Sequence, residues 1–296
     1  MRPLFLRAIL IAAALAAGCS GAPWNNPYPA SEADANTLYS SFSERPKHLD
    51  PVQSYSSNEI TFTAQIYEPP LQYHYLKRPY ILMPLSAEAV PEPQYYDGKG
   101  RRLPPDAAQR DIAHTIYEVR IKRGIRYQPH PAFARGADGK PLYPDLGRAA
   151  IDGKYKLGDF KDTGTRELNA RDFEYQIKRL AHPRLHSPIF GLMAEYIAGL
   201  KEYAEVLKSA NQELTRKARK DAWLDLSRYP LTGVEVVDDY TYRIKIIGQY
   251  PQFLYWLAMP FFAPVPLEVD RFFGQPGMAE KTSRSTGIPS APGPTC

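Results

Sequence analysis

The alternation of apolar and polar residues predicts a half-buried β-strand over residues 115–123. Tyr117, Val119 and Ile121 fall on one face of that strand, and mostly charged side chains fall on the other. Because successive side chains of a strand point to opposite faces, this period of two turns the apolar face toward a core. Residues 234–247 show two further runs of this kind, and the adjacent aspartates between them predict the turn of a β-hairpin.

The clearest helix predicted by the pattern covers residues 168–180. Asn169 can cap its first turn, Asp172 follows three residues later, and Phe173 and Ile177 recur at helical spacing. Residues 57–67 alternate like a strand but begin like a helix, so their pattern leaves both structures open. Further predicted elements are helices over 189–222 with a break at Gly199, over 252–259 and over 266–273, and a buried strand over 261–265.

Proline makes up 29 of the 296 residues, which is about twice its usual share and favours short strands and loops. Tyrosines and prolines interleave over residues 71–97, which is typical of edge strands and surface loops. Residues 129–167 are rich in glycine, proline and aspartate, and they predict an inserted loop with a short hairpin near Asp138-Gly139.

The N-terminus has the pattern of an export signal. Arg2 and Arg7 lie before an apolar run over residues 8–17. This run is shorter than the ~20 residues needed to span a bilayer. Cys19 follows small residues and resembles the lipidated cysteine of a bacterial lipobox. We expect removal of residues 1–18, lipidation of Cys19 and a tether over 19–36, with an ordinary signal peptide and an incidental cysteine as the alternative.

Charge and composition exclude several functional classes. The chain has 37 basic and 32 acidic side chains, and loss of the signal would leave 35 − 32 = +3, scattered along the sequence. An exported chain of this kind is not expected to bind nucleic acid. A mean hydropathy of −0.43 excludes a protein with many membrane spans, and two cysteines cannot form a disulfide framework.

No set of residues predicts catalysis, a metal site or a cofactor. His182 and His186 are four residues apart, but Pro183 lies between them, and a pair of solvated loop histidines is the favoured interpretation. Asp238 and Asp239 are expected to form a turn rather than a catalytic carboxylate pair. The nucleophile elbow, the phosphate-binding loop and the dinucleotide fingerprint are missing from the sequence. We therefore expect a protein that is not an enzyme.

Four segments, in order along residues 37–275, resemble the peptide-binding branch of the extracellular solute-binding proteins of family 5. These proteins deliver oligopeptides to ABC importers. The segments are Leu49-Asp50-Pro51 with Ile66-Tyr67-Glu68, Tyr117 to Tyr127, Leu168 to Tyr175 with Lys178-Arg179-Leu180, and Gly233 to Ile244. The resemblance also favours the helix for residues 57–67.

The resemblance implies a mixed α/β fold, a clamp like the type II periplasmic binding proteins, of which this chain would hold the first lobe only. It implies a first piece of domain I over 37–65, domain II over 66–258 and a return into domain I over 259–280. In the family a peptide lies extended between two lobes and pairs with protein backbone. The resemblance carries such a backbone contact onto Gln53-Ser54-Tyr55-Ser56-Ser57, with a plain solvated loop as the alternative.

Residues 281–296 form a low-complexity tail that departs from the family's pattern. Codons that encode residues 285–296 can be chosen so that another frame reads Gly-Thr-Gly-Pro-Tyr, the motif the family approaches at this point. We therefore hypothesise a frameshift near residues 282–285, which the nucleotide sequence would test. On this hypothesis half of the ligand cleft is missing, and peptides should stabilise the chain as given little or not at all.

The expected function is that of a lipid-anchored receptor on the periplasmic side of the cell envelope. Its partners would be a peptide ligand, the permease and ATPase subunits of an ABC importer, and the membrane through the anchor. The alternative is a structural or interaction lipoprotein of the envelope that binds no small ligand.

Overall fold

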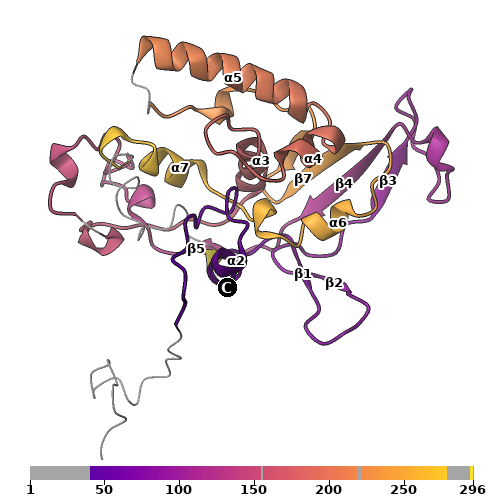
Figure 1. Ribbon diagram of the computed structural model, residues 1–296, viewed down its shortest axis with the longest axis horizontal. Helices are drawn as coiled ribbons and strands as arrows, with labels where there is room; N and C mark the ends of the chain where they lie inside the picture. The colour runs from indigo at the N-terminus through magenta and orange to yellow at the C-terminus, as the bar shows by residue number, and fades with distance from the viewer. Residues whose placement is uncertain (1–40, 155, 219–221, 279–293, 296) are drawn as a thin grey trace, which may run out of the picture. The chain divides into compact units, whose positions relative to one another are not determined.

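The computed structural model describes residues 41–154, 156–218, 222–278 and 294–295. The chain divides into two compact units, residues 1–43 and 44–296. The predicted signal peptide, Cys19, the tether and residues 281–293 and 296 of the tail lie outside the described residues. The elements of the second unit are shown in Figure 1.

A four-stranded antiparallel sheet forms the centre of the second unit. Its strand order is β3-β4-β7-β6, with Pro93–Tyr96, His114–Arg120, Thr241–Ile247 and Val234–Asp238 as the bounds. Strands β6 and β7 are joined by a tight turn, and β7 pairs in turn with β4. The strand and the hairpin predicted from alternation are therefore both present.

One face of this sheet is buried and the other is charged, as an antiparallel sheet with a single covered face requires. Helices α3 (Ala170–Arg179) and α6 (Phe253–Trp256) cover the buried face. Phe173 of α3 stacks on Tyr242 with 5.1 Å between ring centroids, and Phe253 of α6 lies 5.5 Å from Tyr117. The buried residues of the two central strands are Thr115, Tyr117, Val119, Tyr242, Ile244 and Ile246.

Helix α3 begins as its sequence predicts. The side chain of Asn169 accepts the N–H of Arg171 at 3.0 Å, and the carboxylate of Asp172 accepts the N–H of Asn169 at 3.1 Å. These bonds satisfy backbone donors that the helix itself leaves unpaired. The cap fixes the N-terminal end of α3 beside the sheet.

The remaining helices agree with the predictions except in length, and for residues 57–67, whose pattern leaves strand and helix open, the structure has the helix that the resemblance favours. They are α2 (Ser57–Ile66), α4 (Phe190–Tyr196), α5 (Leu200–Lys217) and α7 (Leu267–Phe273). The predicted break at Gly199 is present, and this glycine caps α5 with a φ of 74°. Helix α6 covers only part of the helix predicted for residues 252–259. Short 3₁₀ turns η2–η7 cover Gln109–Asp111, Pro131–Phe133, Ala149–Ile151, Leu157–Asp159, Leu226–Arg228 and Pro260–Phe262.

The buried strand predicted over residues 261–265 is wrong. Phe261 and Phe262 belong to the 3₁₀ turn η7, and no described strand follows them before α7. Prolines at 260, 264 and 266 remove the backbone N–H groups that a sheet ladder needs. The apolar character predicted burial correctly, because Phe261, Phe262, Ala263 and Val265 are all buried.

The proline-rich segments form short edges and turns. Strands β1 (Leu71–Tyr73) and β2 (Leu82–Pro84) pair antiparallel as a separate hairpin. The 129–167 segment contains 3₁₀ turns and a bridge between Arg135 and Pro141, where the short hairpin was predicted. Strand β5 (Arg126–Tyr127) pairs with β8 (Pro294–Thr295), the described part of the tail.

The helices and strands of the second unit together confirm the predicted mixed α/β class.

No helix among the described residues is both long and apolar enough to cross a bilayer.

Candidate ligand-contacting loop and the ion clusters behind it

The candidate loop, Gln53 to Ser57, begins in a tight turn held by Asp50. The N–H groups of Gln53 and Ser54 donate to the carbonyl oxygen of Asp50 at 3.0 and 2.9 Å. The carboxylate of Asp50 accepts the N–H of Val52 at 3.0 Å. Asp50 is itself buried, so the turn is anchored to the interior of the protein.

Glu59, in the first turn of α2, holds the other end of the loop. Its carboxylate accepts the N–H groups of Tyr55 and Ser56 at 3.1 and 3.3 Å, and those of Lys47 and His48 at 3.0 and 2.9 Å. Burial alone would raise the pKa of Glu59, but the hydrogen bonds from His48, Ser56 and Tyr55 outweigh it and lower the pKa to about 2. The carboxylate is therefore charged at neutral pH.

These bonds decide what the loop can offer to a ligand. The N–H groups of Gln53, Ser54, Tyr55 and Ser56 are all engaged within the chain. Main-chain hydrogen bonds from these residues to a ligand would therefore use carbonyl oxygens, of which that of Ser56 already accepts the N–H of Ile60 at 2.9 Å. Tyr55 is the aromatic residue of the loop. Its side chain is exposed over 63% of its surface, and the centroid of its ring lies 6.2 Å from that of Phe261. Ser54 is buried, and its hydroxyl has no hydrogen-bond partner among the described residues.

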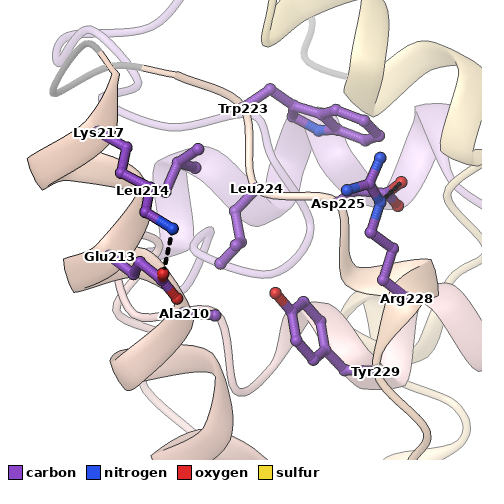
Figure 2. Close-up of a pocket in the computed structure, with 9 residues that line it drawn as sticks. All are labelled: Ala210, Glu213, Leu214, Lys217, Trp223, Leu224, Asp225, Arg228 and Tyr229. Atoms are coloured by element: carbon purple, nitrogen blue, oxygen red, sulfur yellow. Dashed lines mark hydrogen bonds and ion pairs between the residues drawn. The ribbon is translucent and has the colours of Figure 1, made fainter.

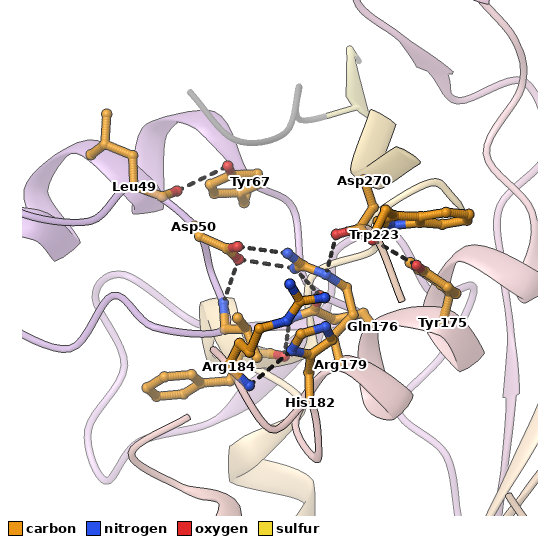
Figure 3. Close-up of polar contacts among 12 residues, drawn as sticks. Leu49, Asp50, Tyr67, Tyr175, Gln176, Arg179, His182, Arg184, Trp223 and Asp270 are labelled. Carbon is orange, nitrogen blue, oxygen red and sulfur yellow. Dashed lines mark hydrogen bonds and ion pairs between the residues drawn. The ribbon is translucent and has the colours of Figure 1, made fainter. Parts of the chain in front are cut away.

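A buried cluster of charged side chains includes Asp50, the residue that holds the first turn of the loop (Figure 3). Arg179, near the C-terminal end of α3, forms two hydrogen bonds to the carboxylate of Asp50, at 2.6 and 2.9 Å. Its Nε donates to Asp270 of α7 at 3.0 Å. Burial lowers the pKa of Arg179, but Asp50 and Asp270 raise it above its ordinary range, so the guanidinium stays charged.

Neutral donors complete this cluster. Tyr175 and Trp223 donate to the second oxygen of Asp270 at 2.7 and 2.8 Å. Although burial raises the pKa of Asp270, Arg179, Trp223 and Tyr175 together bring it below its ordinary value. Gln176 accepts from Arg179 at 3.1 Å and donates to the carbonyl of Phe261 at 2.8 Å. The cluster thus joins the candidate loop, α3, η7 and α7.

A second arginine repeats this arrangement at the other end of α3. Arg166 forms two hydrogen bonds to Asp172, at 2.8 and 2.6 Å, and two to Glu268 of α7, at 2.9 and 2.8 Å. Its guanidinium also lies over the ring of Tyr127, 5.3 Å from the centroid. Both ends of α3 are therefore tied to α7 through an arginine shared by two carboxylates.

The four sequence segments that carry the resemblance meet in space. Asp50 pairs with Arg179, and Tyr67 donates to the carbonyl of Leu49 at 3.0 Å. Backbone hydrogen bonds join the other segments: Ala170 to Asp239 at 2.8 Å, Ile121 to Tyr240 at 2.8 Å and Leu168 to Ile125 at 2.8 Å. The pair of Asp50 and Arg179 was not predicted, although both residues lie in the quoted segments, because a pattern does not reveal a partner 129 residues away.

The two histidines at helical spacing do not form a matched pair. His186 is exposed, as predicted, but His182 is half-buried, and its Nδ1 accepts the N–H of Arg184 at 3.1 Å. Burial lowers the pKa of His182 to about 4. The prediction of two solvated histidines is therefore wrong for His182. The described residues contain no group of three histidine, cysteine or acidic side chains placed to hold a metal ion.

A separate cavity of about 430 Å³ lies between the C-terminal half of α5 and the turn η6 (Figure 2). Its charged residues are paired with one another: Glu213 with Lys217, and Arg228 with Asp225 at 3.2 Å. The 53–57 loop does not line it. The lining residues are Ala210, Glu213, Leu214, Lys217, Trp223, Leu224, Asp225, Arg228 and Tyr229.

Comparison with known proteins gives matches among solved structures alone. No family model matches the chain, and no curated protein matches it. The pheromone receptor PrgZ matches with a TM-score of 0.44 and 18% identity over 78% of this chain and 31% of its own. An oligopeptide-binding protein from Borrelia burgdorferi matches with a TM-score of 0.45 and 15% identity over 78% and 31%. OppA of Listeria monocytogenes, bound to peptide, matches with a TM-score of 0.41 and 12% identity over 76% and 30%.

The chain therefore spans less than a third of the length of these solved structures, and over most of its own length it is similar to proteins described as peptide-binding or oligopeptide-binding.

Proposed function

We propose that this chain is part of a substrate-binding lipoprotein that presents peptides to an ABC importer. In this proposal Cys19 carries the lipid, the protein lies on the periplasmic side of the envelope, and the permease and ATPase subunits are its partners. Residues 37–65, 66–258 and 259–280 are the first piece of domain I, domain II and the return into domain I. Gln53, Ser54, Tyr55, Ser56 and Ser57 contact the peptide.

The observation that carries the proposal is the meeting of the four resembling segments. They lie far apart in the sequence, yet each is joined to another by a hydrogen bond, and one of these contacts is the buried pair of Asp50 and Arg179. Segments that resemble one family and also pack on one another support a common fold, whereas the function has to be argued from the loop itself.

The geometry of the loop favours recognition of a peptide backbone. Asp50 and Glu59 hold its N–H groups from inside, so the loop is ordered before a ligand arrives, and little conformational entropy is lost on binding. Carbonyl oxygens accept hydrogen bonds from any peptide N–H, whatever the side chain. The exposed ring of Tyr55 adds apolar contact with the peptide and does not require a particular peptide sequence.

The proposal can be tested with a fluorescent probe in the loop. Tyr55→Trp is titrated with a mixture of short peptides, and Val206→Trp on α5 is the control, because Val206 is also exposed, over 49% of its surface against 63% for Tyr55. Because the loop offers a few carbonyl oxygens and one exposed ring, we expect weak binding in the millimolar range. The parent chain has three tryptophans, so each signal is the difference between the variant and the parent. The expected difference changes saturably for position 55 and does not change for position 206.

An unchanged signal at position 55 up to the solubility limit of the peptides would count against peptide binding by this loop. Equal changes at positions 55 and 206 would count against it as well, because they would show non-specific association. Either result would favour the second candidate, an envelope lipoprotein that binds no small ligand.

A further inference from the structure

The tip of the β1–β2 hairpin, residues 74–81, carries four exposed large hydrophobic side chains. Tyr75 and Leu76 are accessible over 88% and 77% of their surface, the highest values among the exposed large hydrophobic residues. Tyr80 and Ile81, on the returning side, are also exposed. A patch of this kind on a protein surface marks a site of contact with something else.

The charge of the hairpin has one sign. Residues 71–87 contain no aspartate or glutamate, and their basic residues, Lys77 and Arg78, lie immediately after Tyr75 and Leu76. Both basic residues are exposed. The tip therefore combines two tyrosines, two aliphatic side chains and two cationic groups in eight residues.

The tip is an ordered turn. The N–H of His74 donates to the carbonyl of Ile81 at 2.8 Å, and Nδ1 of His74 accepts the N–H groups of Leu76 and Lys77, both at 3.2 Å. Arg78 donates to the carbonyl of Tyr75 at 3.2 Å, and its guanidinium lies 4.6 Å from the ring centroid of Tyr80. These hydrogen bonds close the turn with Tyr75 and Leu76 at its apex. Both side chains are therefore exposed in the folded hairpin.

We propose that this hairpin tip docks onto an anionic lipid bilayer. Tyrosine at the headgroup level, an aliphatic side chain at the acyl boundary and lysine or arginine beside anionic headgroups are the residue types that favour an interfacial position. Residues 71–87 carry positive charge and no acidic side chain, so they complement a negatively charged lipid surface. They contain no carboxylate that would attract a positively charged peptide. This contact is separate from lipidation of Cys19, and it does not depend on the proposed peptide binding.

The test uses the full chain with Cys19→Ser, so that no attached lipid contributes to binding. Leu76→Trp reports on insertion, and Val206→Trp on α5 is the control for an exposed apolar position elsewhere. Vesicles of phosphatidylcholine with 30% phosphatidylglycerol, with or without brominated acyl chains, are compared with phosphatidylcholine alone. The emission of the parent, which has three tryptophans, is subtracted from that of each variant. In the difference we expect a blue shift and bromine quenching at position 76 with the anionic vesicles, and neither change at position 206.

Two sets of substitutions separate the apolar and the cationic contributions. Tyr75→Ser/Leu76→Ser should lower vesicle binding about tenfold or more, because it removes both side chains at the apex. Lys77→Gln should lower it about fivefold at low salt and much less at high salt. Arg78 is left unchanged because it holds the turn. Lys208→Gln, which removes the same charge from an exposed position on α5, should have little effect.

These side chains are exposed, so the variants should melt at the same temperature as the parent, and a loss of binding would not reflect unfolding. The proposal is overturned if Tyr75→Ser/Leu76→Ser binds anionic vesicles as well as the parent, or if position 76 reports no insertion. It is also overturned if a peptide mixture, and not the vesicles, shifts the emission at position 76. None of these outcomes affects the result expected at position 55.

Discussion

Asp50 is the residue at which the candidate loop and the buried ion cluster meet. Its carbonyl and carboxylate hold the first turn of the loop, and the same carboxylate pairs with Arg179. A buried carboxylate placed in this way couples the position of an exposed segment to the packing of α3 and α7. The loop and the interior should therefore respond together when Asp50 is changed.

We predict that Asp50→Asn lowers the free energy of unfolding by about 3 kcal/mol, because removal of one partner from a buried ion pair leaves a charge poorly compensated. Asp270 still faces Arg179, which keeps the loss at the lower end of the usual range. Urea unfolding measures it. Asp111→Asn is the control, because Asp111 is exposed and lies 3.9 Å from Arg110, and its effect should be within about 0.5 kcal/mol. An Asp50→Asn protein as stable as the parent would contradict the role given to the cluster.

His130 is a second residue whose burial has a measurable consequence. It is 1% exposed, its Nδ1 accepts the N–H of Ala132 at 3.0 Å, and its Nε2 has no hydrogen-bond partner among the described residues. The rings of Phe133, Phe272 and Phe273 surround it. Burial lowers the pKa of His130 from 6.5 to about 4, so the folded protein holds it neutral where the unfolded chain is protonated.

This difference predicts the sign of a pH effect. Between pH 6.5 and 4 the unfolded state binds the proton and the folded state does not, so stability falls as the pH is lowered, by up to about 1.4 kcal/mol per pH unit. His130→Asn can still cap the 3₁₀ turn η3 but does not titrate in this range. Its stability should be lower at pH 7, owing to the lost packing, but should fall less steeply toward pH 4. Equal slopes for the two proteins, measured by urea unfolding at several pH values, would contradict the prediction.

At the scale of elements, the start of α5 depends on a backbone conformation that favours glycine. Gly199 has a φ of 74°, and a Cβ atom there would collide with the hydroxyl of Thr232. Gly191, by contrast, lies within α4 with open space around it. The two glycines therefore form a matched pair for substitution.

We predict that Gly199→Ala lowers the free energy of unfolding by about 2 kcal/mol, from backbone strain and the collision with Thr232. Gly191→Ala should be neutral or stabilising by up to about 1 kcal/mol, because alanine favours a helix. Urea unfolding of both variants measures the difference. If Gly199→Ala were the better tolerated of the two, the conformation assigned to the start of α5 would be wrong.

The elements that the sequence predicted well are those set by local pattern. Strand β4 follows from alternation, α3 from the Asn169 cap, and the β6–β7 hairpin from its turn. The segment 261–265 was not predicted correctly, because burial and strand formation are separate properties and its prolines prevent pairing. Of the candidate site, the resemblance predicted the loop. The shared arginines were found in the structure alone, since Arg179 pairs with Asp50 over 129 residues and Arg166 with Glu268 over 102 residues.

At the scale of the whole molecule, nearly all the buried apolar residues of the described chain belong to one cluster. It runs from Val52, beside the candidate loop, through the sheet to Val269 and Met278. The segments assigned by proposal to two pieces of domain I therefore pack on the same core as the segment assigned to domain II. This continuity supports a rigid frame behind the 53–57 loop.

The central claim is that the 53–57 loop contacts peptides, and cross-linking from the loop tests it most directly. A photoreactive phenylalanine analogue replaces the exposed Tyr55, and the same analogue at Val206 is the control. After illumination with a mixture of short peptides, mass spectrometry identifies the adducts. With isotope-labelled peptides, the account predicts labelled adducts at position 55 and none at position 206. An excess of the same peptides without the label should reduce the labelled adducts at position 55. Adducts that are absent at position 55, or equally abundant at both positions, would contradict it.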